Sequence, residues 1–192
     1  MMSKMIKRKE SIIISAIEVL DELGVNGMTT KEIARRQNIT EPAIYKHFNG
    51  KKEILKEIFK RYSIYDQDIK NTIIDNCMSG KEAIRYFCKV YAEYYQSYPE
   101  ITTIMFSFDI FKYDKEMNED MKIIIDDRYK FLLGHVSKAV EKKEMLVNTN
   151  IQAITDSIFS ILWATTFLWR MENCSFDVKD RILLAVDSIL NI

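Results

Sequence analysis

The sequence predicts an all-α protein with a small N-terminal domain and a larger C-terminal one. Only 5 glycines and 2 prolines occur in 192 residues, too few for the many turns of a β-sandwich or barrel. Apolar residues instead recur at i, i+3, i+4 and i+7, the spacing of one helix face. About nine helices are expected, and three of them with the start of a fourth make up the N-terminal domain.

Charge is divided unevenly along the chain. Residues 1–61 hold 13 Lys and Arg against 8 Asp and Glu, while residues 62–192 hold 15 against 20. Of the 22 aromatic residues, 19 lie beyond residue 61. These shifts predict a basic head at 1–61 and an acidic, aromatic-rich body at 62–192. A basic head suits a polyanion, although a solvated surface explains the charge equally well.

The first two helices follow from their end signals. The first is predicted over about residues 7–23, and Gly24 stops it because glycine readily takes the left-handed conformation. Thr29 is the expected N-cap of a short helix over about residues 30–37. Glu32, three residues later, completes a capping box.

The third helix, over residues 41–48, carries two different faces. Ile44 and Phe48 are four residues apart and therefore share the face that must be buried. Thr40 is the expected N-cap. The exposed side carries a small residue, a cation, an imidazole and a flanking phenol, namely Ala43, Lys46, His47 and Tyr45.

A tight turn joins the second and third helices. Asn38 tolerates the left-handed conformation that such a turn needs. Two short helices joined in this way, the second with a polar exposed face, form the helix-turn-helix pattern, and the major groove of B-DNA admits such a helix. Many all-α proteins contain similar pairs, so the pattern alone indicates DNA binding without identifying it.

The residues of this region resemble a known family. Gly24, then Thr29-Thr-Lys-Glu-Ile-Ala34, then Ile39-Thr-Glu-Pro-Ala-Ile-Tyr45-Lys-His47-Phe48-Asn-Gly-Lys51 resemble the DNA-binding domain of the TetR (tetracycline repressor-like) transcriptional regulators. The likeness covers about residues 8–60, and Tyr-x-His-Phe-x-x-Lys is its most specific part. The chain departs from the family at Gln37-Asn38, where Ala-Gly is frequent, and at Pro42. Both departures bear on the preferred DNA sequence more than on the fold.

The resemblance implies a ligand-responsive homodimer, most often a repressor, that binds a pseudo-palindromic DNA operator. It implies phosphate contacts at Thr29, Thr40, Tyr45, His47 and Lys51. It implies base-edge contacts at Ala43 and Lys46, where lysine can donate to guanine and the alanine methyl can touch a thymine methyl. Packing against the preceding helix is the alternative for Tyr45, and an exposed residue without a role is the alternative for His47.

The body is predicted to be helical throughout. After a linking helix to about residue 76, Ser79 and Glu82 form another capping box. The helices expected there cover about residues 80–97, 101–111, 115–143, 151–171 and 177–190. The resemblance implies that this part senses a ligand and dimerises.

The last two helices carry apolar residues over more than one stripe, which is more than a single core contact requires. A twofold four-helix interface between two copies is the natural use of such a surface. A fully buried hairpin in a monomer is the alternative. The expected interface residues are Ile154, Ile158, Ile161, Leu162, Ile182, Ala185, Val186 and Ile189.

Aromatic and apolar side chains of the body could line a cavity for a small apolar or aromatic effector. The candidates are Tyr91, Tyr95, Met105, Phe106, Phe131, Phe159, Trp163 and Phe167, with Arg128 and His135 placed to pair with a polar end of the ligand. Ordinary core packing is the better explanation for any one of them. A regulator controlled by a protein partner, without a small ligand, is the alternative function.

Catalysis and cofactor binding find little support. The five glycines form neither a dinucleotide-binding motif nor a P-loop, and His47 and His135 are the only histidines. We expect no enzyme, no metal and no cofactor. A small metal-dependent all-α enzyme is the remote alternative, built on an acidic cluster that otherwise indicates a solvated helix start: Asp109, Asp114, Glu116, Glu119 and Asp120.

The expected compartment is the cytoplasm. Three widely spaced cysteines argue against a disulfide framework. The longest uncharged run, residues 157–169, is too short to span a bilayer, so no membrane contact is expected.

Overall fold

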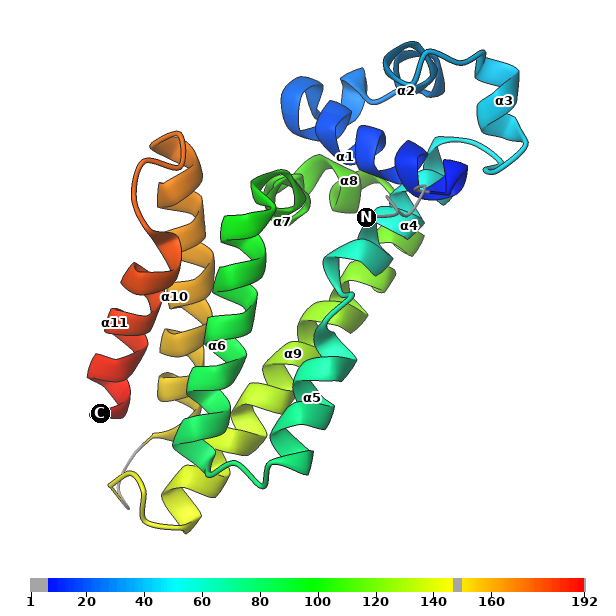
Figure 1. Ribbon diagram of the computed structural model, residues 1–192. Coiled ribbons are helices and arrows are strands. Elements are labelled where there is room, and N and C mark those ends of the chain that lie inside the picture. The colour runs from blue at the N-terminus through cyan, green and yellow to red at the C-terminus, as the bar shows by residue number, and fades with distance from the viewer. Residues whose placement is uncertain (1–6, 147–149, 192) are drawn as a thin grey trace, which may run out of the picture. The chain divides into compact units, whose positions relative to one another are not determined.

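The computed structural model describes residues 7–146 and 150–191, which are helical with no strand among them (Figure 1). The all-α prediction is therefore confirmed. The chain divides into two compact units, one of residues 1–63 with 100–121 and one of residues 64–99 with 122–192. The described residues form eleven α-helices and one 3-10 helix, because two of the expected helices are interrupted.

The first unit is built around an aliphatic core. Its helices are α1 (Arg8–Gly27), α2 (Thr30–Arg36), α3 (Glu41–Tyr45), α4 (Lys51–Tyr62), α7 (Thr103–Phe106), α8 (Phe108–Tyr113) and the first residues of α9 (Lys115–Glu141). Helices as short as α2 and α3 are marginal alone, so packing must hold them. Burial of each large side chain contributes roughly 1.5–3 kcal/mol. The core includes Ile12, Ile17, Leu20, Ile33, Ile44, Phe48, Ile54 and Ile58.

The structure confirms Gly24 as the stop signal of α1 and Thr29 as the N-cap of α2, but not the complete capping box. Gly24 has φ 67° and interrupts α1, which resumes for a few residues. The Thr29 hydroxyl accepts a hydrogen bond from the Glu32 amide at 3.1 Å and so caps α2. The Glu32 carboxylate does not complete the expected capping box with the Thr29 amide. It accepts hydrogen bonds from Arg35 and Arg36 instead.

Helix α3 is shorter than predicted. It ends at Tyr45, and Thr40 makes no side-chain cap hydrogen bond. The amides of His47 and Phe48 both donate to the Ile44 carbonyl, at 2.9 and 3.1 Å, so the last turn tightens and ends the helix. Ile44 and Phe48 are nevertheless buried, which confirms the predicted inward face.

Two helices that were expected to be continuous break near a serine. The linking helix breaks after α4, where the Ser63 hydroxyl donates to the Phe59 carbonyl at 3.1 Å, and α5 (Asp66–Asp75) follows. The helix expected over residues 101–111 breaks at Ser107, whose hydroxyl donates to the Thr103 carbonyl at 2.8 Å. The 3-10 helix η1 (Pro99–Thr102), α7 and α8 take its place. Serine hydroxyls compete with the helical backbone for its carbonyls, which favours breaks of this kind.

The second unit contains α5, α6 (Gly80–Ser97), the rest of α9, α10 (Ile151–Met171) and α11 (Val178–Leu190). Helices α6, α10 and α11 pack side by side (Figure 1). The capping box of Ser79 and Glu82 is present as predicted. Buried Gly80 meets α9 closely, since a Cβ built on it would lie 2.6 Å from the Ala139 nitrogen.

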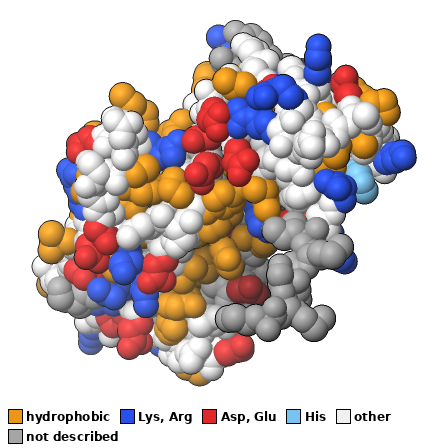
Figure 2. Space-filling model, turned by 45° about the horizontal axis from the view of Figure 1, so that its top comes forward, with side chains coloured by type: hydrophobic (Ala, Val, Ile, Leu, Met, Phe, Trp, Pro, Cys, Tyr) orange, Lys and Arg blue, Asp and Glu red, His pale blue; other side chains and the backbone are white. Residues whose placement is uncertain are grey.

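Apolar side chains also reach the surface, shown in orange in Figure 2. Helix α10 exposes Phe167, Leu168 and Met171, and α11 exposes Leu184. An 18-residue window of α10 has a mean hydropathy of 1.3 and is 22% buried, so by length and composition this helix could cross a membrane. A core helix of a soluble protein passes the same test, so the finding alone indicates neither.

Candidate nucleic-acid interface

Helices α2 and α3 form a helix-turn-helix. Asn38 has φ 52° in the turn between them, as predicted, and the Ile39 amide donates to the Ala34 carbonyl at 3.0 Å. Ala34 itself is buried and small, which lets the neighbouring helix approach. Helix α2 packs on both α1 and α3, so the exposed side of α3 is held on a rigid support.

The exposed side of α3 presents donors to solvent. Lys46 and His47 are exposed, Ala43 is half-buried and Tyr45 is 53% exposed. Neither Lys46 nor His47 forms an ion pair with any side chain that the structure describes. A cation and an imidazole directly after the end of a helix anchored by Ile44 can therefore donate to phosphate oxygens or base edges.

A polar contact that the sequence analysis missed positions Tyr45. The Thr30 hydroxyl donates to the Glu41 carboxylate, and the Tyr45 hydroxyl lies 3.4 Å from the same Thr30 oxygen. This contact ties the start of α2 to α3 and holds the phenol at the edge of the exposed face. The sequence feature that could have predicted this contact is Thr30, a second threonine directly after the N-cap.

Two arginines next to the interface serve the scaffold. Arg36 donates to Glu22 at 2.8 and 2.7 Å and to Glu32 at 3.0 Å, and Arg35 donates to Glu32 at 2.8 Å. Hydrogen bonds from Arg35 first and Arg36 second hold the pKa of Glu32 at about 2. Arg36 therefore holds α2 against α1, and carboxylates compensate the charges of both arginines.

Lys51 is less exposed than the other residues that were expected to contact phosphates. Thr29 and Thr40 are exposed, whereas Lys51 is half-buried. Its ammonium donates to the Val25 carbonyl near the end of α1, and burial lowers its pKa. Lys51 thus ties α4 to α1, and it can reach a phosphate only when that contact breaks.

Three of the predicted effector residues form one buried cluster in the second unit. Arg128, 3% exposed, donates to Asp66 at 2.9 and 2.8 Å, and the Tyr91 hydroxyl donates to the same carboxylate at 2.8 Å. The guanidinium carbon lies 4.4 Å from the Tyr91 ring centroid, and Nη1 lies 3.5 Å from the Tyr95 hydroxyl. Asp66, which the sequence analysis missed, makes this cluster a compensated ion pair.

Two further predicted effector residues, Phe131 and His135, adjoin this cluster through Phe87, whose ring lies 4.7 Å from that of Tyr91 and 6.0 Å from that of Phe131. The rings of Phe131 and His135 meet at 4.6 Å, and those of Phe159 and Tyr129 meet at 5.5 Å. Phe167 is 46% exposed. Met105 and Phe106 belong to the first unit, and Trp163 is half-buried.

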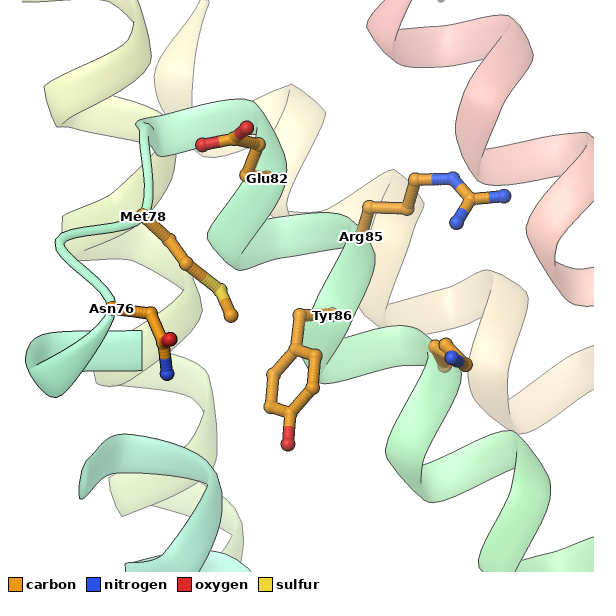
Figure 3. Close-up of a pocket in the computed structure, with 6 residues that line it drawn as sticks. Asn76, Met78, Glu82, Arg85 and Tyr86 are labelled. Atoms are coloured by element: carbon orange, nitrogen blue, oxygen red, sulfur yellow. The ribbon is translucent and has the colours of Figure 1, made fainter. Parts of the chain in front are cut away.

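A pocket of about 430 Å³ lies in the second unit and is lined by Asn76, Met78, Glu82, Arg85, Tyr86 and Lys89 (Figure 3). Arg85 reaches toward α11, where it pairs with Asp187 at 2.7 Å. Glu82 is engaged in the capping box with Ser79. The charges of these two lining residues are therefore already used within the protein.

Half of the predicted dimer residues cannot contact a partner. Ile158, Leu162, Ile182 and Val186 are 5% exposed or less, because they pack where α10, α11 and α6 meet. The prediction is wrong for these four. The other four, Ile154, Ile161, Ala185 and Ile189, are half-buried. The large apolar side chains that these helices expose are Phe167, Leu168, Met171 and Leu184.

The acidic cluster has another use. Asp114 and Glu116 pair with Lys52 at 3.0 and 2.7 Å, which lowers the pKa of both carboxyl groups. Among the described residues, no group of three or more His, Cys, Asp and Glu side chains could hold a metal ion. The side chain of Asp109 lies outside the described residues.

Known proteins resemble both the head and the whole fold. Residues 12–58 match the family model of bacterial regulatory proteins, tetR family. The tetracycline repressor protein class A from transposon 1721 of Escherichia coli is 30% identical over 83 residues. That match covers 38% of this chain and 38% of the repressor, so it spans well under half of either protein.

Solved structures extend the likeness to nearly the whole chain. The fatty acid degradation regulator FadR from Bacillus halodurans has a TM-score of 0.82 at 16% identity, covering 98% of this chain and 97% of that one. The regulator FadR from Bacillus subtilis, in complex with stearoyl-CoA, has a TM-score of 0.79 at 16% identity, covering 94% and 96%. These similarities establish that the body shares the fold of such regulators.

Proposed function

We propose that this chain, whose N-terminal helices belong to the tetR family of bacterial regulatory proteins, is an effector-responsive, homodimeric repressor of transcription. The exposed face of α3 carries this proposal, because Ile44 and Phe48 anchor it while Lys46 and His47 remain available to a ligand. Two such heads would bind half-sites of a pseudo-palindrome about 34–36 Å apart.

In this proposal the residues of the head divide by role. Lys46 and Ala43 meet base edges, and phosphates are met by Thr29, Thr40, Tyr45 and His47. Lys51 joins the phosphate contacts once it leaves the Val25 carbonyl. Phosphate neutralisation supplies much of the affinity, so binding should weaken steeply with salt.

The dimer would form through the apolar side chains that α10 and α11 expose. Met171 is 67% exposed and Leu184 is 71% exposed. Exposed apolar side chains gathered on two packed helices are typical of an interface. A twofold contact between two copies covers them without any further partner.

The effector would be a small apolar or aromatic molecule that binds the body. The stearoyl-CoA held by the Bacillus subtilis regulator makes long-chain acyl thioesters the first compounds to screen. Differential affinity of about 1–3 kcal/mol between two dimer geometries is enough to couple such binding to DNA release. The protein would act in the cytoplasm, where its operator lies.

Selection from random oligonucleotides at low ionic strength tests the proposal. The full chain is expected to enrich a twofold-symmetric site. Lys46→Ala should relax the preference at one position of each half-site by about 1–3 kcal/mol. Lys130→Ala, which removes an exposed lysine of the second unit, is the matched control and should bind as the original chain does.

Two outcomes would contradict the assignment. One is the absence of any enriched symmetric site. The other is an equal loss of affinity on every DNA sequence when Lys46 is replaced, since a base-reading residue must change sequence preference.

A further inference from the structure

The first unit contains a pocket of about 300 Å³ where the end of α1, α4, α8 and the start of α9 meet. The apolar part of its lining consists of Val25, Leu55, Ile110 and Met117. Leu55, Ile110 and Met117 are each no more than 6% exposed, so they form a firm floor, while half-buried Val25 stands at the rim. The volume is at the lower end of the range for small-molecule sites.

Three charged side chains border this head pocket, and two of them neutralise each other. Lys52 pairs with Asp114 at 3.0 Å and with Glu116 at 2.7 Å. Asp114 also accepts from the amides of Glu116 and Met117 at 3.1 and 3.2 Å, so its carboxylate is fully engaged. Neither residue is left to bind a ligand by charge.

Lys51 is the third charged group, and it has no counter-charge among the described residues. Its ammonium donates only to the neutral carbonyl of Val25. Burial is the sole cause that lowers its pKa, with no charged neighbour contributing. A half-buried cation without an anion carries a desolvation cost that a bound anion would offset.

We propose that the head pocket binds a small organic anion with an apolar body, a carboxylate being the simplest case. The carboxylate would accept a charge-assisted hydrogen bond from Lys51. The apolar body would contact Leu55, Ile110 and Met117. All residues that line this pocket belong to the first unit.

The consequence for regulation rests on the proposed function. An anion paired with Lys51 holds that side chain in the pocket and keeps it from a DNA phosphate. The ligand would therefore weaken binding to all DNA sequences alike, because phosphate contacts carry no sequence information.

Methyl-resolved NMR of the full-length chain tests the site directly. Benzoate is the probe, and benzyl alcohol, which has the same ring but no charge, is its match. Benzoate is expected to shift the methyl signals of Leu55, Ile110 and Met117, while Ile158 and Ile182 in the second unit report on binding elsewhere. Benzyl alcohol should bind at least about tenfold more weakly, because it lacks the charge-assisted bond.

Variants localise the charge contact. Lys51→Met should lower the affinity for benzoate about tenfold. Lys60→Met changes a lysine on the exposed side of the same helix and should leave the affinity for benzoate unchanged. Because Lys51→Met also removes the bond to Val25, a second variant is needed: Val25→Phe fills the pocket from its rim and should abolish the methyl shifts with Lys51 still present.

The proposal is overturned if benzoate leaves the three pocket methyls unmoved up to about 10 mM, a concentration at which even millimolar sites fill. It is equally overturned if benzyl alcohol binds as tightly as benzoate. DNA binding is measured separately without benzoate. A chain that binds benzoate but no DNA would refute the proposed function and leave the pocket intact, and the reverse result would refute the pocket alone.

Discussion

Single side chains in this protein are held by partners far away in the sequence. Arg128 binds Asp66 from 62 residues later in the chain, and Tyr91 donates to the same carboxylate. Such a buried pair adds little stability compared with well-packed apolar residues, but its loss leaves a charge without compensation. The cluster therefore fixes the start of α5 against α6 and α9.

Arg128→Met is expected to destabilise the protein by about 3–5 kcal/mol, because the half-buried Asp66 carboxylate then loses its cation. Urea unfolding followed by circular dichroism measures the change. The double variant Arg128→Met with Asp66→Asn should recover part of the loss. A single variant as stable as the original chain would show that the pair is not buried in solution.

His135 should make stability depend on pH. Burial, with a smaller contribution from Lys138, lowers its pKa, and its Nδ1 atom has no hydrogen-bond partner among the described residues. Between that lowered pKa and about 6.5, the unfolded chain binds more protons than the folded one. Stability should therefore fall as the pH falls through this window.

Urea midpoints at pH 7.5 and 5.5 measure this dependence. The drop in the urea midpoint from pH 7.5 to pH 5.5 should be smaller in His135→Gln than in the original chain. Carboxyl groups with lowered pKa titrate below about pH 5 and so contribute little in this range. An unchanged drop in the variant would assign the effect to another group.

Among the helices, α6 and α9 approach each other closely at Gly80. A Cβ on Gly80 would lie within 2.7 Å of the Ala139 nitrogen, Cα and Cβ atoms. The Glu144 carboxylate also accepts from the Gly80 and Lys81 amides, at 3.3 and 2.9 Å, so the start of α6 is anchored on two sides.

Gly80→Ala is expected to cost about 1–3 kcal/mol, because the two helices must separate. Gly134→Ala is the matched control within α9, since a Cβ there meets nothing within 4 Å. That change should stabilise the protein by roughly 0.5–1 kcal/mol through helix propensity. Thermal unfolding of both variants checks the opposite signs, and equal effects would contradict the close contact.

Helix ends were predictable where neighbouring residues decide them. Gly24, Thr29 and Ser79 each act through groups within a few positions, so local pattern was sufficient. The rotation of α10 was not predictable, because apolar residues occupy most of its sides and spacing does not say which side meets α6. Asp66 was not predicted for another reason, because no local signal in the sequence links it to Arg128.

For the molecule as a whole, the proposed dimer depends on the apolar side chains that α10 and α11 expose. Leu184→Asp and Met171→Asp should each shift the protein from dimer to monomer in sedimentation experiments. Ile74→Asp, at a position 66% exposed on α5, is the control and should stay dimeric. A monomeric original chain whose α10 inserts into lipid vesicles would refute the dimer.

Association also couples folding to concentration. If two copies bury the apolar side chains that α10 and α11 expose, the thermal midpoint of the original chain should rise with protein concentration, as mass action requires. The Leu184→Asp chain should lose that dependence. Calorimetry at two concentrations compares them.

Asn38 adopts a left-handed backbone in the turn before α3, a conformation that asparagine tolerates more readily than most residues with a side chain. Search patterns that demand glycine at this position will pass over such chains, although their turns are geometrically equivalent. A pattern written for residues that accept positive φ would retrieve them, and it would list valine and isoleucine there as the substitutions least compatible with a working head.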